Sequence, residues 1–178
     1  MIDKIISYIE FFILNHRFKQ ISRLKEFIGL RSSKSIGIIY YVDDFKVYQQ
    51  VHSFISELQA NKILVSSIGI YSSKLIPSWS NKTINNALIQ EKKYINLQTI
   101  NSSYVENFIK KDFDILIDFS INNKFLPLYI AALSKSKLKI SMDSDIKKKY
   151  FDMLIKITSE DVKDYIYQLK YYLSNIKN

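Results

Sequence analysis

The chain has 178 residues and a formal net charge of +9, from 26 lysines and arginines against 17 acidic residues. A chain of this length can bury one substantial core, and its hydrophobic share of 47% is typical of a globular protein. It has no cysteine and only two histidines, which excludes disulfides, cysteine nucleophiles and a zinc site made of histidines alone.

The positive charge is concentrated in two short segments. Residues 1–34 carry seven basic and three acidic residues, and residues 135–149 carry six and two, so each segment has a net charge of +4. A biased genome composition is the alternative source of the lysines, but it would spread them evenly, so the clustering favours a surface that binds an anionic partner. The candidate nucleic-acid contacts are Arg17, Lys19, Arg23, Lys25, Arg31, Lys135, Lys137, Lys139, Lys147, Lys148 and Lys149.

Residues 2–28 predict one long amphipathic helix, because isoleucine, leucine and phenylalanine recur at intervals of three and four. We expect a helical extension over residues 1–34 and a domain over residues 35–178. The apolar run at residues 5–14 is much shorter than the ~20 residues of a membrane span, and no secretion signal precedes it. The sequence therefore predicts a cytoplasmic protein without a transmembrane segment.

Residues 35–178 alternate strands with helices. Apolar runs predict five strands, at residues 35–42, 63–71, 113–119, 138–142 and 151–157, and residues 95–100 are a further short candidate. Amphipathic stretches predict helices at residues 43–60, 103–111 and 122–133 and after residue 161, while residues 72–101, with the only tryptophan, Trp79, are mostly irregular. This order indicates a three-layer, Rossmann-like α/β domain with a mostly parallel five-stranded sheet.

The carboxyl ends of the predicted strands are the place for a small-ligand site. Asp43, Asp44, Asp118 and Ser120 fall there, although helix capping alone explains Asp43 and Asp44. Asp118 ends a very apolar strand, where a carboxylate without a partner is costly. The chain has no glycine-rich phosphate loop and no nucleophile-elbow serine, so we expect no catalytic residue, no cofactor and no metal.

Several motifs resemble a family of small Rossmann-like bacterial proteins of unknown function, typical of the Bacteroidetes. They are SIGII at residues 35–39, FDILIDF at 113–119, LPLYIAALS at 126–134, KLKI at 137–140 and YFDMLI at 150–155. The resemblance implies a fold and no activity. The strand at 113–119, with the helix and basic strand after it, also looks like the acceptor-side half of heptosyltransferase-type glycosyltransferases, which need two such domains.

Three functions remain open. The first is a non-catalytic binding module that docks RNA or a ribonucleoprotein through the two lysine-rich segments. The second is an assembly protein that forms a homodimer through the N-terminal helix. The third is a small-ligand-binding or enzymatic domain with its site at the strand carboxyl ends. The clustered charge, beside the missing catalytic set, favours the first.

Overall fold

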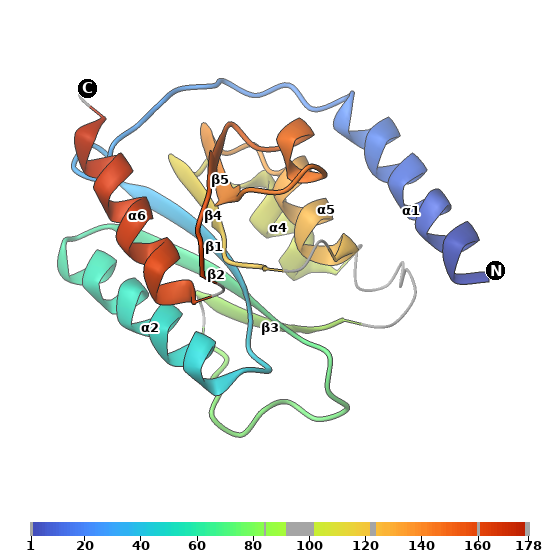
Figure 1. The fold of residues 1–178 in the computed structure, drawn as a ribbon, viewed down its shortest axis with the longest axis horizontal. Helices are drawn as coiled ribbons and strands as arrows, with labels where there is room; N and C mark the ends of the chain where they lie inside the picture. The colour runs from blue at the N-terminus through green and yellow to red at the C-terminus, as the bar shows by residue number, and fades with distance from the viewer. Residues whose placement is uncertain (1, 84, 92–101, 122–123, 160, 177–178) are drawn as a thin grey trace.

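The computed structural model describes residues 2–83, 85–91, 102–121, 124–159 and 161–176, with side chains from Tyr8 onward (Figure 1). The helices are α1 (Ile2–Phe18), α2 (Phe45–Ala60), α4 (Ser103–Lys110), α5 (Phe125–Leu133) and α6 (Val162–Asn175). The strands are β1 (Ser35–Tyr41), β2 (Leu64–Tyr71), β3 (Asn86–Gln90), β4 (Ile115–Asp118), β5 (Leu138–Met142) and β6 (Met153–Ile155), and a 3₁₀ turn, η1 (Lys147–Lys149), precedes β6.

The six strands of the described chain form one sheet in the order β3-β2-β1-β4-β5-β6, and every neighbouring pair is parallel. β1 is central, since Ile36 lies opposite both Val65 of β2 and Ile115 of β4. All carboxyl ends therefore meet at one edge of the sheet. The strand order changes direction between β1 and β4, which is where Rossmann-like sheets open a crevice for ligands.

Helices cover both faces of the sheet, which gives the three predicted layers (Figure 1). On β1, Ile36, Ile38 and Tyr40 pack in the core formed with α2 and α6, whereas Ile39 packs in the core formed with α1, α4 and α5. This alternation is why a strand covered on both faces reads as a continuous apolar run. Gly37 faces the second core, where an added Cβ would lie 2.8 Å from the ring of Phe113.

Side-chain caps fix where the helices begin. Asp44 accepts a hydrogen bond from the Val47 N–H at 3.1 Å and so begins α2, and Asp161 begins α6 in the same way. Ser102 caps α4, which begins at Ser103 as the sequence predicted. α5 is apolar on every side, and all its residues from Leu126 onward are buried.

The prediction of five strands is wrong, because β3 pairs with β2 as a sixth strand inside the segment expected to be irregular. β3 begins at Asn86, a residue typical of loops, but its side chain is buried and accepts a hydrogen bond from the Ser67 hydroxyl at 3.0 Å. The candidate strand at residues 95–100 and the predicted helix start at residues 122–123 lie outside the described residues.

The N-terminal helix is also shorter than predicted, since α1 ends at Phe18. Residues 21–29 form no regular secondary structure and run as an extended connection toward β1. Ile28 is buried as expected, but Leu24 and Phe27, predicted on the same apolar face, are exposed. Apolar residues continue at helix-like intervals after Phe18 because the extended chain lies on the core and buries some of its residues, such as Ile28.

Candidate functional site

The extended part of the first basic segment meets the start of the second at the amino-terminal edge of the sheet. Arg23 donates hydrogen bonds to the carbonyl oxygens of Ser136 and Lys137, at 2.8 and 2.9 Å, joining positions 113 and 114 residues apart. The Glu26 N–H donates to the Lys137 carbonyl at 3.3 Å. Because β5 begins at Leu138, these bonds hold the extended segment after α1 across that edge, where Figure 1 shows it spanning the distance from α1 to α6.

Two of the predicted nucleic-acid residues hold this junction together. Arg23 binds both carboxylate oxygens of Asp152, at 2.5 and 2.7 Å, and only 7% of its side chain is exposed. Lys137 pairs with Asp114 at 3.1 Å and with Glu26 at 3.4 Å. The hydrogen bond to Asp114 raises the pKa of Lys137 and keeps it charged. The charge of both residues is therefore largely neutralised by nearby acids.

The structure corrects the prediction for Lys139 and Lys147, because both are buried and a polyanion cannot reach them. Lys139 donates from Nζ to the Ala132 carbonyl in the last turn of α5, at 2.7 Å. Burial lowers the pKa of Lys139 to about 7. The Nζ of Lys147 lies 3.0 Å from Asp118 Oδ2, on the side of the sheet's carboxyl edge.

Five further residues of the predicted set are exposed, and we call them the basic surface: Arg17, Lys19, Lys25, Lys135 and Lys149. Arg17 donates to the Tyr129 hydroxyl and Lys149 to an asparagine side chain, so both bond to uncharged partners. The Lys25 side chain is 71% exposed, and its ammonium lies 3.4 Å from Asp152, whose charge Arg23 already balances. The basic surface therefore keeps most of its positive charge.

Arg31 and Lys148 complete the predicted set but lie apart from the basic surface in their contacts. Lys148 pairs with Asp145 at 2.7 Å, three residues earlier. Arg31 is exposed in the turn where the Leu30 N–H donates to the Leu173 carbonyl of α6. The charge of Lys148 is therefore balanced by its own neighbour, and Arg31 lies beside α6 at the end of the first segment.

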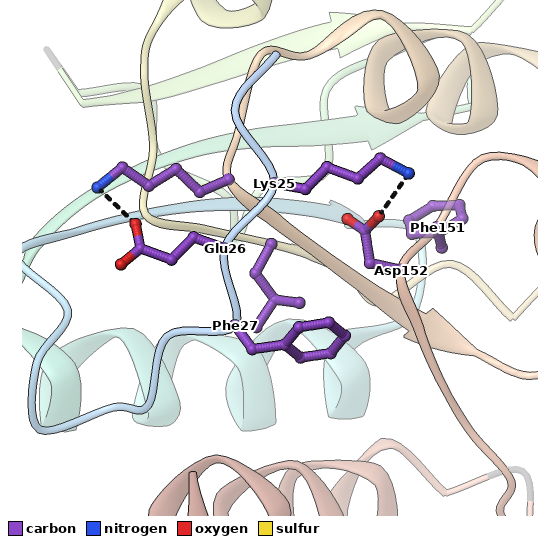
Figure 2. Close-up of a pocket in the computed structure, with 7 residues that line it drawn as sticks. Lys25, Glu26, Phe27, Phe151 and Asp152 are labelled. Atoms are coloured by element: carbon purple, nitrogen blue, oxygen red, sulfur yellow. Dashed lines mark ion pairs between the residues drawn. The ribbon is translucent and has the colours of Figure 1, made fainter. Parts of the chain in front are cut away.

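Two adjoining pockets, of about 310 and 280 Å³, lie beside the junction and share Lys25, Phe151 and Asp152 in their walls. Figure 2 shows Lys25 pointing toward Asp152 at the larger one, with Phe27 on the neighbouring stretch of chain. Lys149 lines only the smaller pocket. At the larger pocket both lysines pair with acids of the same wall, Lys25 with Asp152 and Lys137 with Glu26.

The predicted small-ligand residues Asp118 and Ser120 lie at the carboxyl edge, inside a buried network centred on Lys147. The Lys147 ammonium donates to the Ser120 carbonyl at 2.6 Å and to the Ser141 hydroxyl at 2.8 Å. Asp118 also accepts from the Ser120 N–H at 2.8 Å and from the Ser141 hydroxyl at 3.0 Å. The network satisfies the carboxylate that the sequence left without a partner, and its side chains are all buried.

The other two predicted ligand residues have identifiable structural tasks. Asp44 caps α2. Asp43 Oδ2 accepts from both the N–H and the hydroxyl of Ser72, at 2.8 and 2.6 Å, which fastens the loop after β2 to the end of β1. Within the described residues, no hydrogen bond joins Asp43 to Asp118, so the four predicted residues form two separate groups at the same edge.

In the part of the chain that the structure describes, histidines and carboxylates form no group of three or more that could hold a metal ion. None of the described helices combines the length and the hydrophobicity that crossing a bilayer requires.

The fold and these sites define a Rossmann-like α/β protein that has only three glycines. Residues 10–176 match the profile of a family of unknown function, DUF6913, and the chain belongs to that family, which confirms the predicted resemblance to an uncharacterised family. No curated protein matches the chain. Among solved structures it is similar to the glycosyl transferase family 9 from Veillonella parvula DSM 2008, with a TM-score of 0.52 and 12% identity. The similarity covers 82% of this chain and 42% of that one, and it shows a shared fold.

Proposed function

We propose that this protein is a non-catalytic, cytoplasmic binding module that docks an anionic partner on the basic surface, and RNA or a ribonucleoprotein is the partner we favour. The observation that carries the proposal is the meeting of two basic segments, far apart in the sequence, at one edge of the sheet. Arg23 and Lys137 act as the internal clamp of that edge, and the basic surface is the part left to meet a partner.

The chemistry of the surface favours a single-stranded polyanion. Four of its five cations are lysines, which attract phosphates as point charges and lack the planar fork with which arginine reads base edges. Phe27, 60% exposed beside the larger pocket, offers a face on which a base can stack. We therefore expect binding that is sensitive to salt and tolerant of sequence.

The test measures fluorescence anisotropy of a labelled generic single-stranded RNA at about 50 and about 200 mM salt. The variant combines Lys25→Gln, Lys135→Gln and Lys149→Gln. The matched control removes the same charge from exposed lysines at or beyond the carboxyl edge, through Lys74→Gln, Lys156→Gln and Lys163→Gln.

We expect the native protein to bind at low salt and to weaken as salt rises. Loss of three phosphate contacts should reduce the slope of log affinity against log salt by about 2, because each contact to a single strand contributes roughly 0.7. The control should keep the native slope. Absence of binding at low salt, or an equal loss in variant and control, would remove the proposal.

Self-association through α1 is the second candidate, because this helix carries apolar residues on two sides. Leu14 is buried in the core with α5, whereas Tyr8 and Phe12 are 76% and 65% exposed. A helix that is apolar around most of its circumference is usually covered on both sides. Sedimentation of the native protein and of a Tyr8→Ser/Phe12→Ser variant tests this idea, and a native protein that is already monomeric rejects it.

A further inference from the structure

A shallow hollow of about 510 Å³ lies at the carboxyl ends of β1 and β2, at the opposite edge of the sheet from the basic surface. It is lined by Asp43, Ser72, Ser73, Leu75, Ile76, Pro77 and Trp79. An apolar hollow with a few polar groups at this edge has the form of a small-molecule site in an α/β protein.

A fixed aromatic ring forms one wall of the hollow. The indole N–H of Trp79 donates to the Val42 carbonyl at 3.0 Å, which ties the ring to the end of β1. Phe45 meets it edge to face, with the ring centres 5.6 Å apart. Trp79 remains 39% exposed, so part of the ring is available to a ligand. Leu75 and Ile76, 81% and 52% exposed, supply apolar surface beside it.

The polar groups of the hollow offer acceptors and almost no donors. The hydroxyl of Ser72 donates to Asp43 Oδ2 and that of Ser73 to the Leu75 carbonyl, both at 2.6 Å. The indole N–H is used as well. Asp43 Oδ1 receives a single long contact, 3.5 Å from the Ser73 N–H. A ligand that presents only acceptors therefore finds no free side-chain donor on Ser72, Ser73 or Trp79.

Asp43 also lacks a cation. Among the described residues, no lysine or arginine lies within ion-pairing distance of Asp43, although the chain carries an excess of nine positive charges. Its second oxygen has spare acceptor capacity, and Asp43 lines the same hollow as the partly exposed Trp79 ring. A carboxylate and a tryptophan face together attract a cation, the first by charge and the second through the quadrupole of the ring.

We propose that this hollow binds a small organic ammonium ion with an apolar body. The ammonium donates to Asp43 Oδ1, and the apolar body packs on Trp79, Leu75 and Ile76. This site is independent of the basic surface and takes a ligand of the opposite charge. The same chemistry is present in a free amine and in a lysine side chain of a peptide, and the experiment separates these two sources.

Intrinsic fluorescence reports on this site directly, because Trp79 is the only tryptophan of the chain. The probe is phenylethylammonium, compared with phenylethanol and phenylacetate, which keep the ring but carry no charge or a negative charge. We expect a saturable change in emission with the ammonium, at least tenfold weaker binding of the alcohol, and no saturable change with the acid. N-acetyl-lysine amide is the additional arm, and saturation by it at lower concentration assigns the site to peptides.

The variant is Asp43→Asn, whose amide oxygen can still accept from Ser72, so the loop keeps its attachment. Asp44→Asn is the matched control, because asparagine caps a helix as well as aspartate does. The proposal expects at least tenfold weaker ammonium binding in the first variant and native binding in the second, with unchanged circular dichroism in both. Equal binding of ammonium and alcohol, native affinity in Asp43→Asn, or quenching that rises linearly without saturation would overturn it.

Discussion

Lys139 is a buried amine in the middle of a fully covered strand, and replacing it by methionine should stabilise the protein. Its ammonium has one hydrogen-bond acceptor, the Ala132 carbonyl, and is surrounded by core on both faces of β5. Arg23 and Lys25 lower its pKa further, after burial, and Asp152 opposes them. Methionine fills a similar volume without a charge to desolvate.

The magnitude follows from the pKa. A lysine that titrates at 10.5 in the unfolded chain and at about 7 in the folded one costs about 5 kcal/mol of folding free energy when both states are protonated. Loss of the hydrogen bond to Ala132 takes back about 1–3 kcal/mol, because that carbonyl loses its donor. We expect a net gain of about 2–4 kcal/mol for Lys139→Met below neutral pH.

The sign of the pH dependence is fixed by the same two values. Below pH 7, Lys139 of the unsubstituted protein is protonated in both the folded and the unfolded state, so the full desolvation cost lowers the stability. Between about 7 and 10.5 the folded state releases it while the unfolded state keeps it, so the stability of the native protein rises by about 1.4 kcal/mol per pH unit. The advantage of Lys139→Met should therefore shrink as pH rises.

Urea unfolding of both proteins at about pH 6.5 and about pH 9 measures this difference. Lys135→Met is the control, since it removes an exposed lysine of the same segment and should show no such trend. A variant less stable than the native protein at the lower pH, or an advantage that does not change with pH, would refute the reasoning.

Three further changes test the packing and the clamp. Asp118→Ala should cost about 3–5 kcal/mol by leaving the buried Lys147 ammonium without its carboxylate, and a second change, Lys147→Met, should restore most of it in urea unfolding. Gly37→Ala should lower stability by about 1–3 kcal/mol, because the new methyl group meets Phe113 at 2.8 Å; an unchanged midpoint would contradict that contact. Arg23→Ala should cost about 3 kcal/mol and make residues 19–29 a preferred site of tryptic cleavage, and a native cleavage pattern would show that the clamp is dispensable.

The central strands covered on both faces could be predicted from the sequence, since β1 and β4 read as almost continuous apolar runs. β3 could not, because it lies at an edge and begins with Asn86, whose amide oxygen accepts from the hydroxyls of Ser67 and Tyr40, which only the fold brings near. The end of α1 was mispredicted for a similar reason. An extended chain that lies on the core can bury residues at intervals that resemble those of a helix, as Ile28 does.

The candidate site shows where composition stops being informative. Residues Lys147–Lys149 look alike in the sequence, yet the 3₁₀ turn points successive side chains to different sides, so Lys147 enters the core while its neighbours stay exposed. The sequence does carry a signal for Lys139, because a lysine inside a strand that has a neighbouring strand on each side has no route to solvent. The two basic segments meet because Arg23 binds the carbonyl oxygens of Ser136 and Lys137. No local sequence pattern predicts this contact, since the partners are 113 and 114 residues apart.

The central place of β1 has a consequence for synthesis on the ribosome. β1 pairs with β2 soon after it is made, but its other partner, β4, begins about 80 residues after β1 starts. Until then the most apolar strand of the nascent chain has one row of unpaired backbone groups, and a long loop must close before that row is satisfied. The first two thirds of the polypeptide should therefore depend on chaperones, or on the pace of translation, until residue 118 has left the exit tunnel.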